Sequence, residues 1–159
     1  MKFNSVMHVS FYTDQINEML DFYVNKLGLK QKTIVRFKEY KGSTARPMFA
    51  KLAETDPEGI FYTYIEIADG QFLELFPTLG NQLPHREWNQ DLGYSHFALT
   101  CDDIFETVKQ MREAGIEPDT EISKGPSETY QCWFHDPDGN KFELMQYTEK
   151  SWQVVGHFS

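Results

Sequence analysis

Short runs of alternating apolar and polar residues, interrupted by a helical pattern, make up the first half of the chain. Residues 5–12 alternate as a half-buried strand does. Thr13-Asp14 then offers an N-cap and Gly28 a C-cap for a helix whose apolar face consists of Ile16, Met19, Leu20, Tyr23, Val24 and Leu27. Three further strands are predicted at residues 29–37, 60–68 and 71–76, and an Asp-Gly turn joins the last two as a hairpin.

The second half repeats this order of elements. After an alternating strand at 94–101, Asp102-Asp103 can cap a helix with an apolar face of Ile104, Phe105, Val108 and Met111, and Gly115 can end it. Strands are then predicted at residues 116–123, 130–135 and 141–147. Each half is therefore a βαβββ unit, and two such units predict an α+β fold. We expect one domain over residues 1–159, comprising a first module at about 5–78, a linker at 79–93, a second module at about 94–148 and a C-terminal tail at 149–159.

The two halves differ in the length of one connection. His8 and Glu74 are 66 positions apart, whereas the corresponding His96 and Glu143 are 47 apart. The surplus of 19 residues falls at about residues 37–60, a stretch that contains two glycines and two prolines. We interpret it as an inserted loop or irregular hairpin that is a candidate lid.

Each half places one His near the start of its first strand and one Glu in the middle of its last strand. These residues are His8 and Glu74, then His96 and Glu143, and in each case the opposite strand face is apolar. A carboxylate between apolar neighbours is costly to desolvate unless a cation compensates it. One divalent metal would compensate two carboxylates and two imidazoles, a donor set that suits Ni²⁺, Zn²⁺, Co²⁺, Mn²⁺ or Fe²⁺. Taken singly, a strand His is usually structural and a strand Glu usually faces water.

The composition narrows the classes of partner. With 15 Lys and Arg against 24 Asp and Glu, the chain has a net charge of −9, which argues against binding to nucleic acid. No apolar run is long enough to span a membrane, and the N-terminus has no signal-peptide pattern. Two cysteines are too few for a disulfide scaffold, so we expect a cytoplasmic protein with reduced thiols.

The arrangement resembles the vicinal oxygen chelate superfamily, the group of glyoxalase I, bleomycin-resistance proteins and extradiol dioxygenases. The matching segments are Met7–Tyr12, Met19–Gly28, Phe72–Phe76, Tyr94–Leu99 and Asp136–Leu144. The resemblance implies paired βαβββ modules that form a cup-shaped mixed sheet with helices on the outside and a metal at its centre. It implies that His8, Glu74, His96 and Glu143 are the metal ligands. It also implies a homodimer with sites at the interface, to which both subunits can contribute ligands; a closed monomer is the alternative.

The resemblance further implies a glyoxalase I-like lyase or isomerase that acts on a small oxygenated molecule. Four protein ligands leave two positions on an octahedral ion, enough for the bidentate enediolate that forms when a proton leaves the carbon next to a carbonyl. We expect Glu143 to carry the proton, with Glu74 able to serve the opposite face. A ring-cleaving dioxygenase of the same superfamily needs only three protein ligands and is the first alternative. A drug-binding resistance protein without catalysis is the second.

Substrate recognition is less well defined by the sequence. Tyr12 and Thr78 stand where glyoxalase I carries an Arg and an Asn for glutathione, so dependence on glutathione is doubtful. Tyr12, Phe72 and Trp133 are candidate substrate-binding residues, because aromatic residues that alternate on strands can line an apolar pocket, although such residues more often only pack. Seven basic residues gather within residues 30–51, which we interpret as a solvated strand edge and loop rather than a site for anions.

Overall fold

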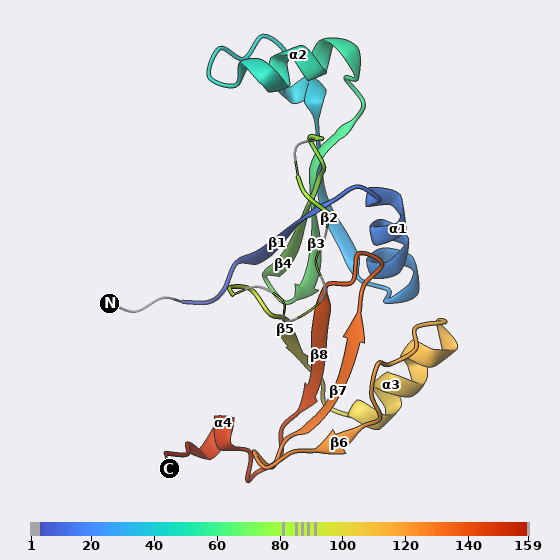
Figure 1. Cartoon of the computed structure of the whole chain (residues 1–159), viewed down its shortest axis with the longest axis vertical. Helices are drawn as coiled ribbons and strands as arrows, with labels where there is room; N and C mark the ends of the chain where they lie inside the picture. The colour runs from blue at the N-terminus through green and yellow to red at the C-terminus, as the bar shows by residue number, and fades with distance from the viewer. Residues whose placement is uncertain are drawn as a thin grey trace. The chain divides into compact units, whose positions relative to one another are not determined.

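A computed structural model describes residues 4–80, 82–84, 86, 88, 90 and 92–158 of the chain. The chain divides into two compact units, Met1–Leu83 and Pro84–Ser159. Each unit is built around a four-stranded mixed sheet with a helix beside it (Figure 1). The predicted α+β fold with two βαβββ modules is therefore confirmed.

The first unit has the sheet order β1-β4-β3-β2. Its strands are β1 (His8–Thr13), β2 (Lys30–Arg36), β3 (Ile60–Ala68) and β4 (Gln71–Pro77). β1 runs parallel to β4, and the other neighbours are antiparallel. Between β1 and β2 the chain forms helix α1 (Ile16–Leu20), which continues as a π-helical segment (Asp21–Lys26). Gly28 follows with a φ of +69°, the left-handed conformation that a helix-ending glycine adopts readily.

The second unit repeats this topology with the sheet order β5-β8-β7-β6. Its strands are β5 (Phe97–Thr100), β6 (Ser123–Lys124), β7 (Tyr130–His135) and β8 (Lys141–Gln146), and β5 runs parallel to β8. Helix α3 (Ile104–Glu113) is capped as the sequence predicts, because the Asp103 carboxylate accepts hydrogen bonds from the amides of Phe105 and Glu106, both at 3.0 Å. A short helix, α4 (Trp152–Val155), lies in the C-terminal tail.

The prediction of a strand at residues 116–123 was wrong for most of its length. Only Ser123–Lys124 pairs with β7 as a strand. Pro118 has no amide hydrogen for a sheet ladder, and the Asp119 side chain is engaged with His135 and Lys141. This segment therefore contacts β7 at isolated points and forms no regular ladder there; one such contact is the hydrogen bond of 2.7 Å from the Asp119 amide to the Trp133 carbonyl.

The β2–β3 insertion, residues 37–59, is not the irregular loop that its glycines and prolines suggested. It contains a 3₁₀ turn (Phe37–Tyr40) and helix α2 (Pro47–Thr55), in which Pro47 occupies the first turn, where proline is well tolerated. Two backbone hydrogen bonds of 3.0 Å close its base, from the amides of Phe37 and Lys38 to the carbonyls of Gly59 and Pro57. Figure 1 shows α2 beyond the ends of β2 and β3, at the far end of this unit.

A separate apolar cluster holds the β2–β3 insertion against the sheet. Its buried members are Phe37, Ala53 and Phe61, and Val35, Tyr40, Phe49, Leu52, Tyr62 and Phe76 pack around them. Phe61 is central, because its ring lies 4.3 Å from that of Phe49 and 4.9 Å from that of Tyr40, measured between centroids. The insertion thus forms a wall of the first unit, held by packing of the kind that supports a core.

We expect Phe61→Ala to weaken the packing of the β2–β3 insertion on the sheet, because it removes the ring that joins α2 and the 3₁₀ turn to β3. The free energy of unfolding should fall by about 3 kcal/mol or more. Limited proteolysis should become faster within residues 41–46. Phe105→Ala, at an exposed ring on α3, is the control and should cost less than about 1 kcal/mol. Equal effects of the two variants in denaturant titrations would contradict the role of the cluster.

Candidate metal and substrate site

A His–Glu pair lies on one face of the first sheet. Ser10 on β1 is the register partner of Glu74 on β4, and His8 precedes Ser10 by two residues. His8 and Glu74 therefore share a face, since side chains two positions apart point the same way. The His8 Nε2 atom lies 3.5 Å from Glu74 Oε2. Residues that are 66 positions apart in the chain meet because β1 and β4 are parallel neighbours.

The second sheet builds the same pair at the same register. Ala98 on β5 is the partner of Glu143 on β8, and His96 precedes Ala98 by two residues. His96 Nε2 lies 3.8 Å from Glu143 Oε2. β5 begins one residue later than His96, so this imidazole is carried by the backbone that enters the strand. Each unit thus brings together one imidazole and one carboxylate.

Both carboxylates are buried. Glu74 and Glu143 each expose only 7% of their surface, and each lies between two buried apolar residues on its strand. Burial raises the pKa of Glu143 above its ordinary value, and the neighbouring His96 partly opposes this shift. A carboxylate in this setting needs a positive partner when it is ionised.

An aromatic side chain accompanies each pair. Tyr64 on β3 is the register partner of Glu74, and Trp133 on β7 is that of Glu143. The Tyr64 ring lies edge-on to His8 with 5.8 Å between centroids, and the Trp133 ring lies 4.7 Å from that of His96. Burial and hydrogen bonding to the Glu74 side chain raise the pKa of Tyr64 to about 12, so this phenol stays protonated and can donate.

Hydrogen bonds orient the two imidazoles so that Nε2 faces the carboxylate. The His96 Nδ1 atom lies 3.0 Å from Ser95 Oγ, which also accepts a hydrogen bond of 3.2 Å from the Trp88 indole. In the first unit, His8 Nδ1 lies 2.8 Å from the Met7 sulfur. Sequence reasoning missed Ser95 and Trp88 as positioning residues. A hydroxyl next to a candidate ligand His was the available signal.

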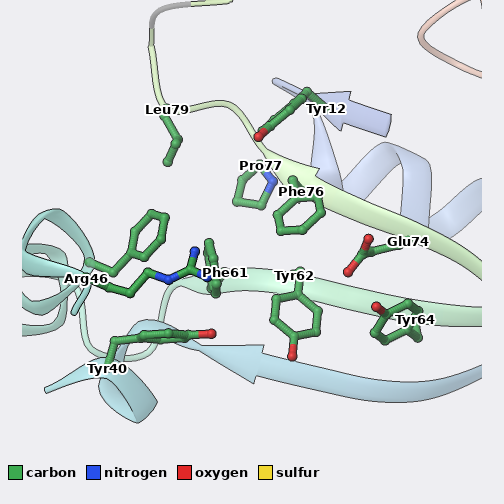
Figure 2. Close-up of a pocket in the computed structure, with 11 residues that line it drawn as sticks. Tyr12, Tyr40, Arg46, Phe61, Tyr62, Tyr64, Glu74, Phe76, Pro77 and Leu79 are labelled. Atoms are coloured by element: carbon green, nitrogen blue, oxygen red, sulfur yellow. The ribbon is translucent and has the colours of Figure 1, made fainter. Parts of the chain in front are cut away.

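A cavity of about 320 Å³ opens beside Glu74 in the first unit (Figure 2). Its lining is mainly aromatic and consists of Tyr12, Tyr40, Arg46, Phe49, Phe61, Tyr62, Tyr64, Glu74, Phe76, Pro77 and Leu79. Among the predicted substrate-binding residues, Tyr12 lines this cavity. Phe72 does not line it, and packs on Tyr64 with 5.7 Å between ring centroids. Trp133 belongs to the second unit, beside His96.

The β2–β3 insertion supplies cavity residues that the sequence analysis did not assign to a site. Tyr40 and Phe49 were part of a presumed loop, and Arg46 was one member of a basic stretch. The solvated interpretation fits other members of that stretch, because Lys32 pairs with Glu66 at 2.9 Å and Lys38 pairs with Glu58 at 3.0 Å. The spacing of Phe49, Leu52 and Ala53 was the signal for a helix.

The donor atoms fit a divalent first-row metal. Imidazole nitrogen and carboxylate oxygen are ligands that such ions accept, and each unit presents one of each on a face that also carries aromatic side chains. Within the described part of the chain, no three or more His, Cys, Asp or Glu side chains gather closely enough to hold a metal ion. We call each His–Glu pair a half-site, because it supplies two of the four predicted ligands.

The sequence matches the Glyoxalase/Bleomycin resistance protein/Dioxygenase superfamily over residues 5–144. The chain belongs to this superfamily. A lactoylglutathione lyase from Neisseria meningitidis serogroup A is 28% identical over an alignment of 150 residues, and the match covers 89% of either chain. Biphenyl-2,3-diol 1,2-dioxygenase 3 from Rhodococcus globerulus is 27% identical over an alignment of 141 residues, and the match covers 87% of this chain and 60% of that relative.

Solved structures of the glyoxalase superfamily share the fold. The crystal structure of a glyoxalase family protein from Enterococcus faecalis matches with a TM-score of 0.67 and 23% identity, over 91% of this chain and 99% of that one. Members of the superfamily act on small molecules and usually use a divalent metal. Among the described helices, none has the length and apolar composition that crossing a membrane requires.

We expect Glu143→Gln to stabilise the protein in the presence of a chelator at pH 7, by about 0.5–2 kcal/mol. Because the pKa of Glu143 is raised in the folded state, its ionisation costs stability as the pH rises through that pKa. Below the pKa that Glu143 has in the unfolded chain, the Glu and Gln side chains are both neutral. The difference in unfolding free energy between the two proteins should then vanish. Denaturant titrations of both proteins at pH 7 and pH 4 measure this, and a less stable variant at pH 7 would contradict it.

Proposed function

We propose that this protein is a divalent-metal-dependent lyase or isomerase that transfers a proton within a small oxygenated substrate. The observation that carries the proposal is the repetition of one His–Glu pair at the same register in both sheets. Two isolated strand His residues and two isolated strand Glu residues would have no reason to share this relation. A common ligand explains both the repetition and the burial of the two carboxylates.

In this proposal His8, Glu74, His96 and Glu143 are the metal ligands. The metal would be Ni²⁺, Zn²⁺, Co²⁺, Mn²⁺ or Fe²⁺, and when bound it would stabilise negative charge that develops on substrate oxygens. The two half-sites have to combine, either within one chain or between the chains of a homodimer. A set of four ligands would need both half-sites, because each supplies one imidazole and one carboxylate.

The chain's own groups move the proton. Glu143 accepts it from the hydroxyl-bearing carbon next to the substrate carbonyl and returns it to the former carbonyl carbon. The hydroxyl proton passes to the former carbonyl oxygen, so the reaction is an isomerisation in which no electrons are gained or lost overall. Glu74 serves the opposite face. Ser95 and Trp88 keep the His96 ring in place, and the Tyr64 hydroxyl, which stays protonated, donates toward Glu74 and limits where that carboxylate can turn.

The relative with a lactoylglutathione lyase name supports this reaction class. Use of glutathione is a separate question, because the position at which glyoxalase I carries an Arg for glutathione holds the Tyr12 phenol, which lines the cavity. Thr78 is already engaged, since its hydroxyl donates to Gln82 Oε1 at 2.8 Å. Turnover of a hemithioacetal, with and without glutathione as the thiol, tests this directly.

We expect the purified protein, after reconstitution, to bind about one divalent metal ion per chain, measured by elemental analysis. His96→Ala should weaken metal binding by about tenfold or more, because it removes a donor. His135→Ala is the matched control, since this imidazole is exposed and pairs with Asp119 at 2.6 Å. No bound metal in the wild type, or equal losses in both variants, would leave a metal-free binding protein as the better account.

A ring-cleaving dioxygenase is the second candidate, favoured by the similarity to the Rhodococcus enzyme. Four protein ligands argue against it, because a catecholate and O₂ together need three open positions. We expect no oxygen uptake when the reconstituted protein is mixed with 2,3-dihydroxybiphenyl in an oxygen electrode. Uptake that depends on Fe²⁺ would overturn the proton-transfer proposal.

A further inference from the structure

Arg46 gives the aromatic cavity a positive end. It immediately precedes α2 in the β2–β3 insertion, and its guanidinium carbon lies 6.0 Å from the centre of the Phe49 ring. Arg46 is the one cationic side chain among the residues that line the cavity. Figure 2 shows it at the opposite end of the group from Glu74.

No carboxylate of the described residues forms an ion pair with Arg46. Other cations of the same stretch do have such partners: Lys32 pairs with Glu66, and both Arg36 and Lys38 pair with Glu58. A guanidinium presents five N–H donors in the plane of the group. Those donors are therefore available to a ligand in the cavity.

The cavity between Arg46 and Glu74 is built to hold an apolar body. β3 and β4 place Phe61, Tyr62 and Phe76 along it, with ring centroids 5.3 Å apart for Phe61 and Tyr62 and 5.6 Å apart for Tyr62 and Phe76. The apolar cluster beneath α2 fixes the insertion that carries Arg46, so this wall is already formed before a ligand enters. Preorganisation of this kind lowers the cost of binding.

We propose that Arg46 binds a carboxylate of the substrate, and that the substrate is a small carboxylic acid with an aromatic or other apolar body. The carboxylate accepts two hydrogen bonds from the guanidinium, and the body lies against the aromatic rings of β3 and β4. The oxygenated end that reacts then lies near Glu74. Only this last step rests on the proposed function; the binding of the carboxylate by Arg46 stands without it.

A carboxylate held by Arg46 would be bound differently from the glutathione of glyoxalase I, in which an Arg follows the first ligand His by four residues. The position four residues after His8 holds Tyr12, so the cation of this cavity comes instead from the insertion that lengthens the first module. The competing interpretation is an Arg46 that only covers Phe49 by a cation–π contact and contributes nothing to a ligand. The two interpretations predict different responses to the charge of a ligand.

Phenylacetate and its neutral analogue phenylacetamide are suitable probes, because they share a ring and differ in the charge of one end. Binding is measured by isothermal titration calorimetry on the full chain in the presence of a chelator. We expect wild-type protein to bind phenylacetate more tightly than phenylacetamide. Arg46→Gln should weaken phenylacetate binding by about tenfold to a hundredfold and leave phenylacetamide binding unchanged. Arg46→Lys should fall between the wild type and Arg46→Gln.

Lys51→Gln is the matched control, since Lys51 is an exposed cation on α2, the helix that Arg46 immediately precedes, and does not line the cavity. It should leave the affinities for both probes unchanged. Equal affinity of wild-type protein for the two probes, no measurable binding of phenylacetate, or the same loss in Lys51→Gln would overturn the proposal. Phenylacetamide binding also reports whether the Arg46 variants keep an intact cavity.

These results distinguish the binding of a carboxylate by Arg46 from the proposed proton-transfer reaction. Charge discrimination by a protein that never binds metal would refute the proposed reaction and leave the role of Arg46 in place. A metal-loaded protein without charge discrimination would do the opposite.

Discussion

The parallel pairing of the first and last strands of each unit is the constraint on which the site depends. Only this pairing places a His from the start of a module beside a Glu from its end. The crossover that separates parallel strands is long, so the two residues are remote in the sequence. Both carboxylates are buried on the face where an imidazole and an aromatic ring of a neighbouring strand lie beside them. Their desolvation is the cost that a bound cation would offset.

Strand alternation made much of this arrangement readable from the sequence. In β4 and β8 the apolar neighbours of Glu74 and Glu143 fix the face of each carboxylate, and the order of elements is the same in both halves. The sequence could not predict the distances within each pair, because these depend on which strands become neighbours and in what register. It also could not show that Ser95 and Trp88 hold His96, since hydrogen bonds between side chains leave no periodic pattern.

Two errors of sequence reasoning occurred in segments that contain prolines. Pro47 and Pro57 suggested a loop, yet Pro47 begins α2, where its missing amide costs nothing. Pro118 lies in a segment with strand-like composition, and here the missing amide helped to prevent a ladder. The same residue type thus starts one element and disrupts another, according to whether its nitrogen faces a helix end or a neighbouring strand. The effect of each proline therefore depends on the structure around it, which the sequence alone does not reveal.

The two backbone hydrogen bonds at the base of the β2–β3 insertion have a consequence for how this protein can diverge. They return the chain to the sheet next to the point where it left. The insertion therefore begins and ends at the same place, and a change in its length does not shift β2 relative to β3. Its sequence can lengthen, shorten or exchange its cation while β2 and β3 keep their alignment. Evolution, or a protein engineer, can therefore retune what enters the aromatic cavity and leave the residues beneath it untouched.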